Sequence, residues 1–193
     1  MNTADIARRL DNLIRLGTIA EVDVAAARVR VATGQLLTGW LPWLALRAGT
    51  TRHWSAPTVD EQVVLFSPSG ELTQGVALVG LYSDANPANG NSADVQRTTY
   101  PDGAVIEYDH VTHQLQATLP EGGVTKLVST GGIYIDGPII HQGDYTQTGN
   151  QNVTGKVTVS EDVVAAGVSL VKHPHDGVMS GPSVTGAPIP EGA

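Results

Sequence analysis

The second half of the chain constrains the fold most. Between residues 95 and 172 the sequence consists of short strand-like runs with Gly or Pro between or within them, for example 104–108, 113–119, 153–159 and 163–171. In several runs one face is Val, Ile or Leu and the other is Thr, Gln, Lys or Ser, an alternation typical of β-strands. The spacing of the runs varies, so we predict no repeat of fixed period. Such thin strands in a monomeric sheet would leave edges unpaired, and proteins avoid this by closure or association.

The composition points the same way. Only 5% of the 193 residues are aromatic, with one Phe and two Met against 22 Gly. Such a chain is short of bulky core residues, and wrapping around copies of itself would supply the missing burial. We therefore expect intertwined chains, with an ordinary β-sandwich as the alternative. Cysteine is absent, so stability must come from packing, backbone pairing or a metal.

Charge and hydropathy exclude several classes of protein. The formal net charge of −8 repels phosphate backbones, so no nucleic-acid partner is expected. Charged residues interrupt positions 1–16, which excludes a signal peptide, and no apolar run approaches the roughly 20 residues that a membrane helix needs. We expect a soluble protein that is made in a cytoplasm.

The first 17 residues predict a short amphipathic helix. It is expected to run over 3–16 with Thr3 as N-cap and Gly17 as the stop, because apolar residues recur at helical spacing.

Residues 18–83 predict a small β-barrel. Strict alternation over 27–32 and apolar runs at 62–66 and 75–82 give about five short strands, which favours an OB-like Greek key. Residues 84–94 are rich in turn formers and predict a linker. Within the barrel, Trp40, Trp43 and Trp54 are compatible with a stacking platform for sugars or bases, but barrel core or a subunit contact is the favoured interpretation.

No catalytic constellation is apparent, so the protein is not expected to be an enzyme. A cluster of carboxylates and imidazoles, Glu107, Asp109, His110 and His113, does not make a convincing metal site, because His110 and His113 would point to opposite faces of a strand.

His173 and His175 are different. In an extended strand side chains two residues apart share a face, and Pro174 excludes a helix interior. Two imidazoles alone are too few for most metal sites. If three chains met on a three-fold axis, six imidazoles would surround one ion, a donor set that suits iron(II), nickel or cobalt better than zinc. With all six positions filled, such a metal would be structural.

The order of these parts resembles the tail spike family of contractile-tailed phages, baseplate assembly protein V. The phrases that carry the resemblance are 60–65, 67–70 and 75–83 in the barrel and the terminal His-Pro-His-Asp-Gly at 173–177. The resemblance implies an all-β homotrimer: an OB-fold at the baseplate, an intertwined triple-stranded β-helix needle over 95–172, and a metal-binding tip over 173–193.

The same resemblance implies the ligands, partners and role. His173 and His175 of three chains would bind one iron ion per trimer, and further axial ions such as calcium or chloride are assigned to no residue. The expected function is a structural spike of the virion tail baseplate, assembled in the host cytoplasm, that contacts other baseplate and tail-hub proteins. It would pierce the host outer membrane when the tail contracts.

Three alternatives remain open from the sequence. A metal-dependent hydrolase would use His173 and His175 with a carboxylate such as Asp176. A carbohydrate-binding tail fibre would use the tryptophans. A phage-tail-like bacteriocin or a related injection machine would share the architecture of the spike.

Overall fold

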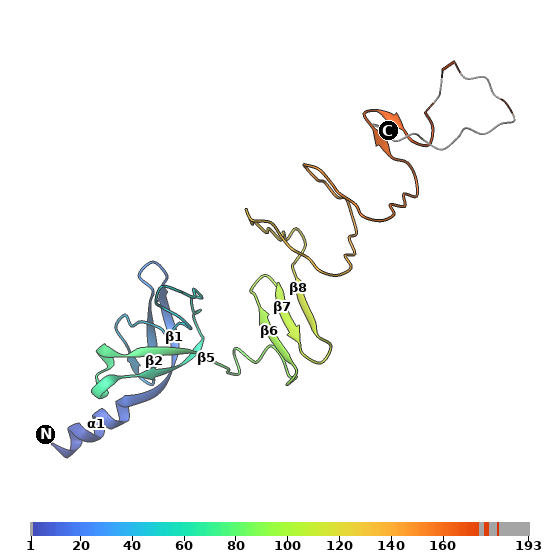
Figure 1. Ribbon diagram of the computed structural model, residues 1–193. Coiled ribbons are helices and arrows are strands. Elements are labelled where there is room, and N and C mark those ends of the chain that lie inside the picture. The colour runs from blue at the N-terminus through green and yellow to red at the C-terminus, as the bar shows by residue number, and fades with distance from the viewer. Residues whose placement is uncertain (1, 174–175, 178–180, 182–193) are drawn as a thin grey trace. The chain divides into compact units, whose positions relative to one another are not determined.

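The computed structural model describes residues 2–173, 176–177 and 181. The chain divides into two compact units, Met1–Thr130 and Gly131–Ala193, each of which is described by itself. The described residues form one short α-helix, two 3₁₀ turns and ten strands (Figure 1). The predicted all-β class is therefore confirmed. Among the described helices, none has the length and apolar content needed to cross a membrane.

The N-terminal helix α1 spans Thr3–Leu13, and the prediction was wrong at both of its ends. Asn2 is the N-cap, since its side chain accepts a hydrogen bond from the backbone N–H of Ala4 at 3.1 Å. At the other end the helix stops before Ile14, which begins a strand and pairs with Phe66. The backbone pairing of this strand overrides the helical spacing of the apolar residues.

The first five strands form one antiparallel sheet in the order β3-β2-β1-β4-β5. A segment after β3 closes it: Leu41 bridges to Val29 on β2, and Trp43 bridges to Ala77 on β5. This agrees with the predicted OB-like barrel. The elements are β1 (Ile14–Asp23), β2 (Arg28–Thr33), β3 (Leu36–Leu37), β4 (Gln62–Phe66) and β5 (Val76–Leu81), with 3₁₀ turns η1 (Pro68–Gly70) and η2 (Leu72–Gln74) between β4 and β5.

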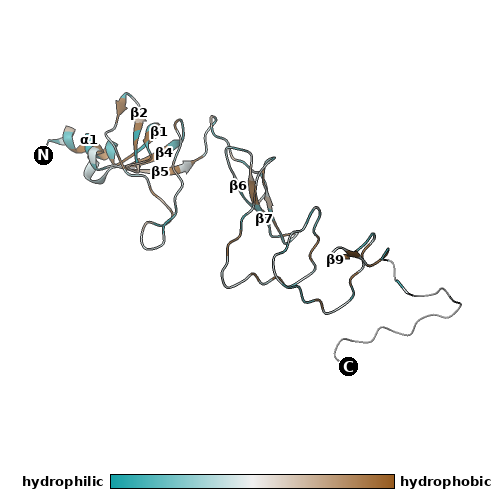
Figure 2. Ribbon diagram, turned by 90° about the horizontal axis from the view of Figure 1, so that it is seen from above, coloured by the Kyte–Doolittle hydropathy of each residue, from teal (hydrophilic) through white to brown (hydrophobic). Residues whose placement is uncertain are grey.

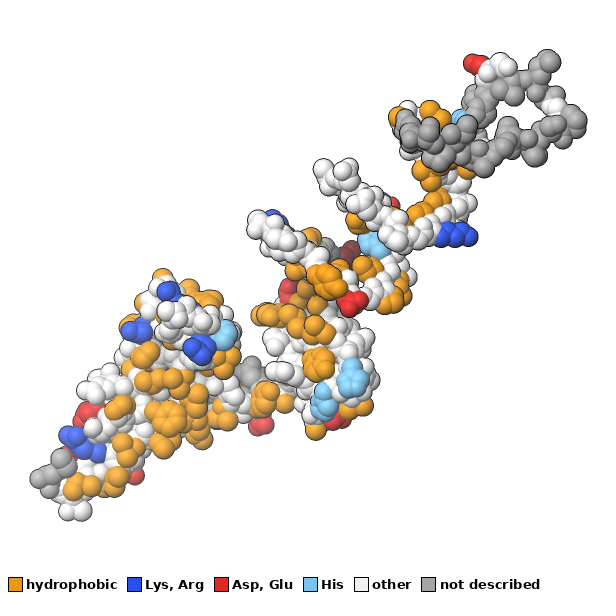
Figure 3. Space-filling view, viewed as in Figure 1, with side chains coloured by type: hydrophobic (Ala, Val, Ile, Leu, Met, Phe, Trp, Pro, Cys, Tyr) orange, Lys and Arg blue, Asp and Glu red, His pale blue; other side chains and the backbone are white. Residues whose placement is uncertain are grey.

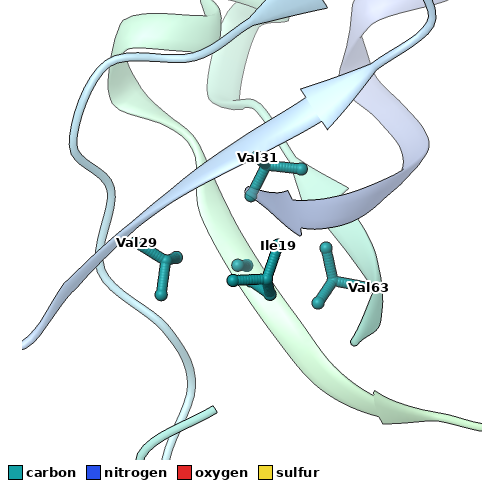
Figure 4. Packing of buried hydrophobic residues seen from close by; sticks show 5 residues of the cluster. Ile19, Val29, Val31 and Val63 are labelled. Carbon is teal, nitrogen blue, oxygen red and sulfur yellow. The ribbon is translucent and has the colours of Figure 1, made fainter. Parts of the chain in front are cut away.

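The barrel has a small core of its own. Figure 4 shows side chains of this cluster gathered between the strands, and each of its members is fully buried. On β2 and β4 buried positions alternate with more exposed ones, as expected for strands with one face turned inward. The cluster consists of Ile19, Val29, Val31, Val63 and Ala77.

Gly17 lies inside β1 and not at a helix end. A Cβ at this position would overlap the side chain of Val31 and stand 2.8 Å from the carbonyl oxygen of Ala32. The glycine is needed because β1 and β2 approach each other too closely for any side chain.

The second sheet is a three-stranded antiparallel meander of neighbouring strands, β6 (Val95–Thr99), β7 (Val105–Asp109) and β8 (Gln114–Thr118) (Figure 1). This stretch was predicted to be part of an intertwined needle, yet its three strands pair within one chain. Most of its side chains are nevertheless exposed, including Leu115 and Tyr108. The meander is therefore a single-layered sheet whose strands bury no hydrophobic cluster among the described residues.

Residues 119–163, all of which the structure describes, contain no strand. Short hydrophobic and hydrophilic stretches follow one another along this part of the chain (Figure 2). Glycines with positive φ stand at 137, 143, 149 and 155, a spacing of six residues. The prediction of no fixed period was made from the spacing of the apolar runs, and the regular feature of this stretch is instead the spacing of these glycines.

The close approach at Gly17 gives a test of the barrel. Gly17→Ala is expected to lower the free energy of unfolding by about 1–3 kcal/mol, since the added methyl group must push apart two paired strands. Urea denaturation of the full chain, followed by tryptophan fluorescence, measures it, because all three tryptophans lie between residues 40 and 54. Gly39→Ala is the matched control: a Cβ there meets nothing within 4 Å, so little change is expected. Equal effects of the two substitutions would contradict the steric account.

Candidate functional site at the C-terminal hairpin

The predicted metal ligands follow directly after a short hairpin. Strand β9 (Val164–Ala165) pairs with β10 (Val168–Ser169), and the loop between them is Ala166-Gly167. Both loop residues have positive φ, 50° and 82°, as the tight turns of two-residue hairpins require. Residues 163–171 were expected to form one strand-like run, and the structure corrects this because the chain reverses at Gly167.

Two polar side chains tie the base of this hairpin together. Asp162 Oδ1 accepts hydrogen bonds from the N–H groups of Val163 at 2.8 Å and of Val171 at 3.2 Å. Ser169 Oγ accepts from the N–H groups of Val171 at 3.2 Å and of Lys172 at 2.8 Å. The Ser169 hydroxyl, together with these backbone donors, holds the pKa of Asp162 below its usual range. The carboxylate therefore fixes the path of the chain into residue 173.

The imidazole of His173 is oriented by the same hairpin. Its Nδ1 lies 2.6 Å from the carbonyl oxygen of Ser169, and the ring is half-buried. A carbonyl oxygen can only accept, so Nδ1 carries the proton and Nε2 carries the lone pair. Metal-bound histidines commonly show this arrangement, in which the second ring nitrogen donates to a backbone carbonyl. His173 thus has the tautomer of an Nε2 ligand.

The second predicted ligand, His175, lies outside the described residues, as does most of the predicted tip over 173–193. Within the described part of one chain, no group of three or more His, Cys, Asp or Glu side chains is placed to hold a metal ion.

The acidic and imidazole cluster near β7 is engaged in ordinary structural contacts. Glu107 forms an ion pair with Arg97, and His110 Nε2 lies 3.3 Å from Asp94. Asp109 accepts from the N–H groups of Thr112 and Val111, which holds its pKa below the usual range. His113 adopts a positive φ of 55° in the same turn. Glu107 and Asp109 thus lie on β7, and His110 and His113 lie in the turn that connects β7 to β8.

Of the three tryptophans, one is half-buried and two are exposed. Trp43 is half-buried and packs against the barrel core, as the favoured interpretation predicted. Trp54 is 65% exposed and lies against Trp43, with ring centroids 5.6 Å apart and planes tilted by 58°. Trp40 is exposed and lies beneath the guanidinium of Arg30.

Sequence reasoning missed Asp162 and Ser169. Their role depends on hydrogen bonds to backbone groups across a turn, which spacing alone does not indicate. The Ala-Gly pair between two apolar runs was the available signal, since small residues that tolerate positive φ mark hairpin loops.

Two histidines of the chain are expected to hold opposite tautomers in the metal-free protein. His173 donates through Nδ1 to Ser169, whereas His141 Nε2 lies 3.1 Å from the carbonyl oxygen of Asp144 and must donate through Nε2. Imidazole ¹⁵N chemical shifts above about pH 8, where ordinary histidines are neutral, distinguish the two forms. An Nε2-protonated His173 would contradict the assigned role of the hairpin.

Two segments of the chain, one near each end, match known protein families. Residues 15–82 match the family model described as the type VI secretion system/phage-baseplate injector OB domain, and residues 167–188 match the GpV Apex motif. The second match contains both predicted ligands, His173 and His175.

The chain is also 42% identical, over 139 residues, to the spike protein of Escherichia phage P2. That alignment covers 72% of this chain and 65% of the relative, so it spans slightly less than two thirds of the relative's length. These matches confirm the resemblance of the chain to the phage baseplate spikes of the baseplate assembly protein V family.

Proposed function

We propose that this protein is the central spike of a contractile-tail baseplate and acts as a homotrimer with a structural, non-enzymatic role. Its place would be the virion tail, where it contacts other baseplate and tail-hub proteins. The similarity to a phage spike protein and to an injector OB domain supports this role.

The observation that carries the proposal is the exposed apolar surface beyond the second sheet. In the single chain Tyr134 is 90% exposed and Ile140 is 89% exposed, and further Val, Ile and Leu side chains there are exposed as well. Each buried Å² of such surface is worth about 25 cal/mol, so a partner that covers it gains substantial free energy. Soluble proteins rarely leave such surface open. Two further copies of the same chain would cover it.

The six-residue spacing of the glycines supports three intertwined chains. Between successive glycines the chain runs for five residues. The second position after the glycine is apolar in three of the four cases, Ile139, Tyr145 and Val157, and is Gln151 in the other. The positions on either side of these are mostly polar, as in a strand with one buried face. Each six-residue segment would then contribute one short extended stretch to a core shared by the three chains. The glycine at its end would turn the chain into the next segment. This stretch would belong to the intertwined part of the needle, which would follow the meander of β6 to β8.

The tip over 173–193 would join the three chains through one metal ion. His173 and His175 from each chain would supply six imidazole nitrogens, and the Nδ1–H donation of His173 fits it for binding through Nε2. Six nitrogen donors suit iron(II), the ion that we propose. The metal would fasten three chain ends that otherwise fray, and it would leave no coordination position for water. Calcium or chloride ions elsewhere on the axis are assigned to no residue.

The work of such a spike is mechanical. Contraction of the tail would drive the needle through the host outer membrane, and intertwining would prevent any strand from peeling away alone. The net charge of −8 fits a shaft that must pass anionic lipid without adhering to it. A bacteriocin of phage-tail type would use the same device.

The decisive experiment measures mass and metal on the same sample. We expect a species of three times the 20.1 kDa chain mass, with one iron per three chains, from light scattering and elemental analysis. The substitutions His173→Ala and His175→Ala together should remove the metal and leave the trimer mass unchanged, because the needle holds the chains together.

Other outcomes would favour the rival functions. A monomer at micromolar concentration would overturn the trimeric spike. One metal per chain with chelator-sensitive hydrolysis would favour the hydrolase. Glycan binding that is lost in Trp40→Ala or Trp54→Ala would favour the carbohydrate-binding fibre.

The hairpin predicts how firmly the metal is held. Asp162→Ala removes the acceptor for two backbone N–H groups and loosens the segment that leads to His173. We expect the metal to be lost at a chelator concentration about tenfold lower than for the native protein, the usual scale for groups that orient metal ligands. Asp136→Ala is the matched control, since it also removes one carboxylate from the same unit of the chain. Equal metal loss from both variants would show that charge, and not the hairpin, matters.

A further inference from the structure

A pocket lies beside the barrel, on the long connection between β3 and β4. Its floor is apolar and includes Trp43, which packs against the barrel core, and Trp54. Cationic side chains also line the pocket. They are Arg28, Arg47 and Arg52, with His53 beside them.

Backbone contacts hold the pocket in shape although it lacks regular strands. The N–H of Leu44 donates to the carbonyl of Ala77 at 2.9 Å, and the N–H of Ala77 donates to the carbonyl of Pro42 at 3.0 Å, which ties the floor to β5. On the other side the N–H of His53 donates to the carbonyl of Arg47 at 3.0 Å. The pocket is therefore formed before any ligand arrives, which lowers the entropic cost of binding.

The charge of the pocket stands out against the rest of the molecule. The chain holds only 11 Lys and Arg against 19 Asp and Glu, yet three arginines line this one pocket. Among the described residues, none of the three forms an ion pair with a carboxylate, and Arg28 and Arg52 each donate one hydrogen bond to a backbone carbonyl. Outside the pocket, Arg15 bonds to neutral side chains, and the remaining arginines are paired with carboxylates: Arg8, Arg9, Arg30 and Arg97. Figure 3 shows Lys or Arg side chains gathered, with a histidine, at the end of the barrel away from α1. Uncompensated arginines around an apolar floor favour an anionic ligand with an apolar part.

We propose that this pocket binds an acidic peptide segment in which a Leu or Phe side chain is flanked by Asp or Glu. The tilted rings of Trp43 and Trp54 form a corner and not a flat platform, so they fit a single apolar side chain better than a stacked sugar or base. The arginines would pair with the flanking carboxylates. The identification of the partner as a neighbouring baseplate protein rests on the proposed spike function, but the binding itself does not.

The binding test uses a defined probe. A fluorescein-labelled peptide, Gly-Asp-Glu-Leu-Phe-Asp-Glu-Gly, is titrated with the full-length protein and followed by fluorescence anisotropy. Its counterpart with Asn and Gln in place of Asp and Glu measures the contribution of charge. We expect the acidic peptide to bind with Kd below about 100 μM, a weak to moderate affinity, and the neutral peptide at least about tenfold more weakly. Added salt should weaken the binding of the acidic peptide.

Three variants locate the site. Arg47→Gln should weaken binding about fivefold, the scale of one partly exposed charge pair. Trp54→Ala should weaken it about tenfold or more, as the loss of an aromatic anchor does. Arg8→Gln removes the same charge from α1, outside the pocket, and should leave Kd unchanged. Circular dichroism confirms that each variant is folded.

The other outcomes overturn the proposal. Absence of binding up to about 1 mM peptide would do so, as would binding that Arg8→Gln weakens as much as Arg47→Gln. Tighter binding of single-stranded DNA or of a phosphorylated oligosaccharide, with the same dependence on Arg47 and Trp54, would assign the pocket to that class of ligand instead. Mass and metal content do not enter this test, so the spike proposal and the pocket proposal fail separately.

Discussion

One constraint underlies the structure: a single copy of the chain leaves exposed the apolar side chains that follow its second sheet in the sequence. The barrel closes around Ile19, Val31 and Val63, all fully buried, whereas Ile140 and Tyr134 lie open to water. Apolar surface of this extent is stable only when something covers it. In the proposed trimer, association of identical chains would supply the cover without a second protein, and the six-residue spacing of the glycines would give each chain the same edge to contribute. Every later property of the proposed needle, including its stiffness and the meeting of three chain ends, follows from this shared core.

The barrel was largely predictable because its strands alternate strictly. Val29 and Val31 are buried while their neighbours are more exposed, which the sequence pattern over 27–32 indicates directly. The end of α1 was not predictable, since Ile14 fits both a helical face and the first position of a strand. Pairing with Phe66, far along the sequence, decides between the two. Gly17 shows the same limit: its sequence position suggests a helix stop, but a close approach of β1 to β2 explains it.

The ligands of the candidate tip stay a prediction from the sequence, whereas the hairpin that orients His173 could not be predicted. Two histidines separated by one residue can be found by inspection, and the match to the Apex motif covers them. The orientation of His173 depends on a hairpin whose turn falls at Ala166 and Gly167, inside what looked like one continuous run. The contributions of Asp162 and Ser169 arise from hydrogen bonds to backbone groups, which no spacing rule reveals.

The two kinds of core imply that folding and association are coupled differently along the chain. The barrel pairs its strands within one chain and buries its own cluster, so its folding does not depend on protein concentration. The stretch over 119–163 has no strands of its own, and its order in the proposed trimer comes from other copies. Such a segment gains stability by mass action, so the needle would form only as chains meet. Metal binding at the tip would come last, because six imidazoles converge only after the three chains are aligned. In the proposed trimer each chain would thus arrive with its barrel already folded, and the metal would fasten a needle that the shared core has already built.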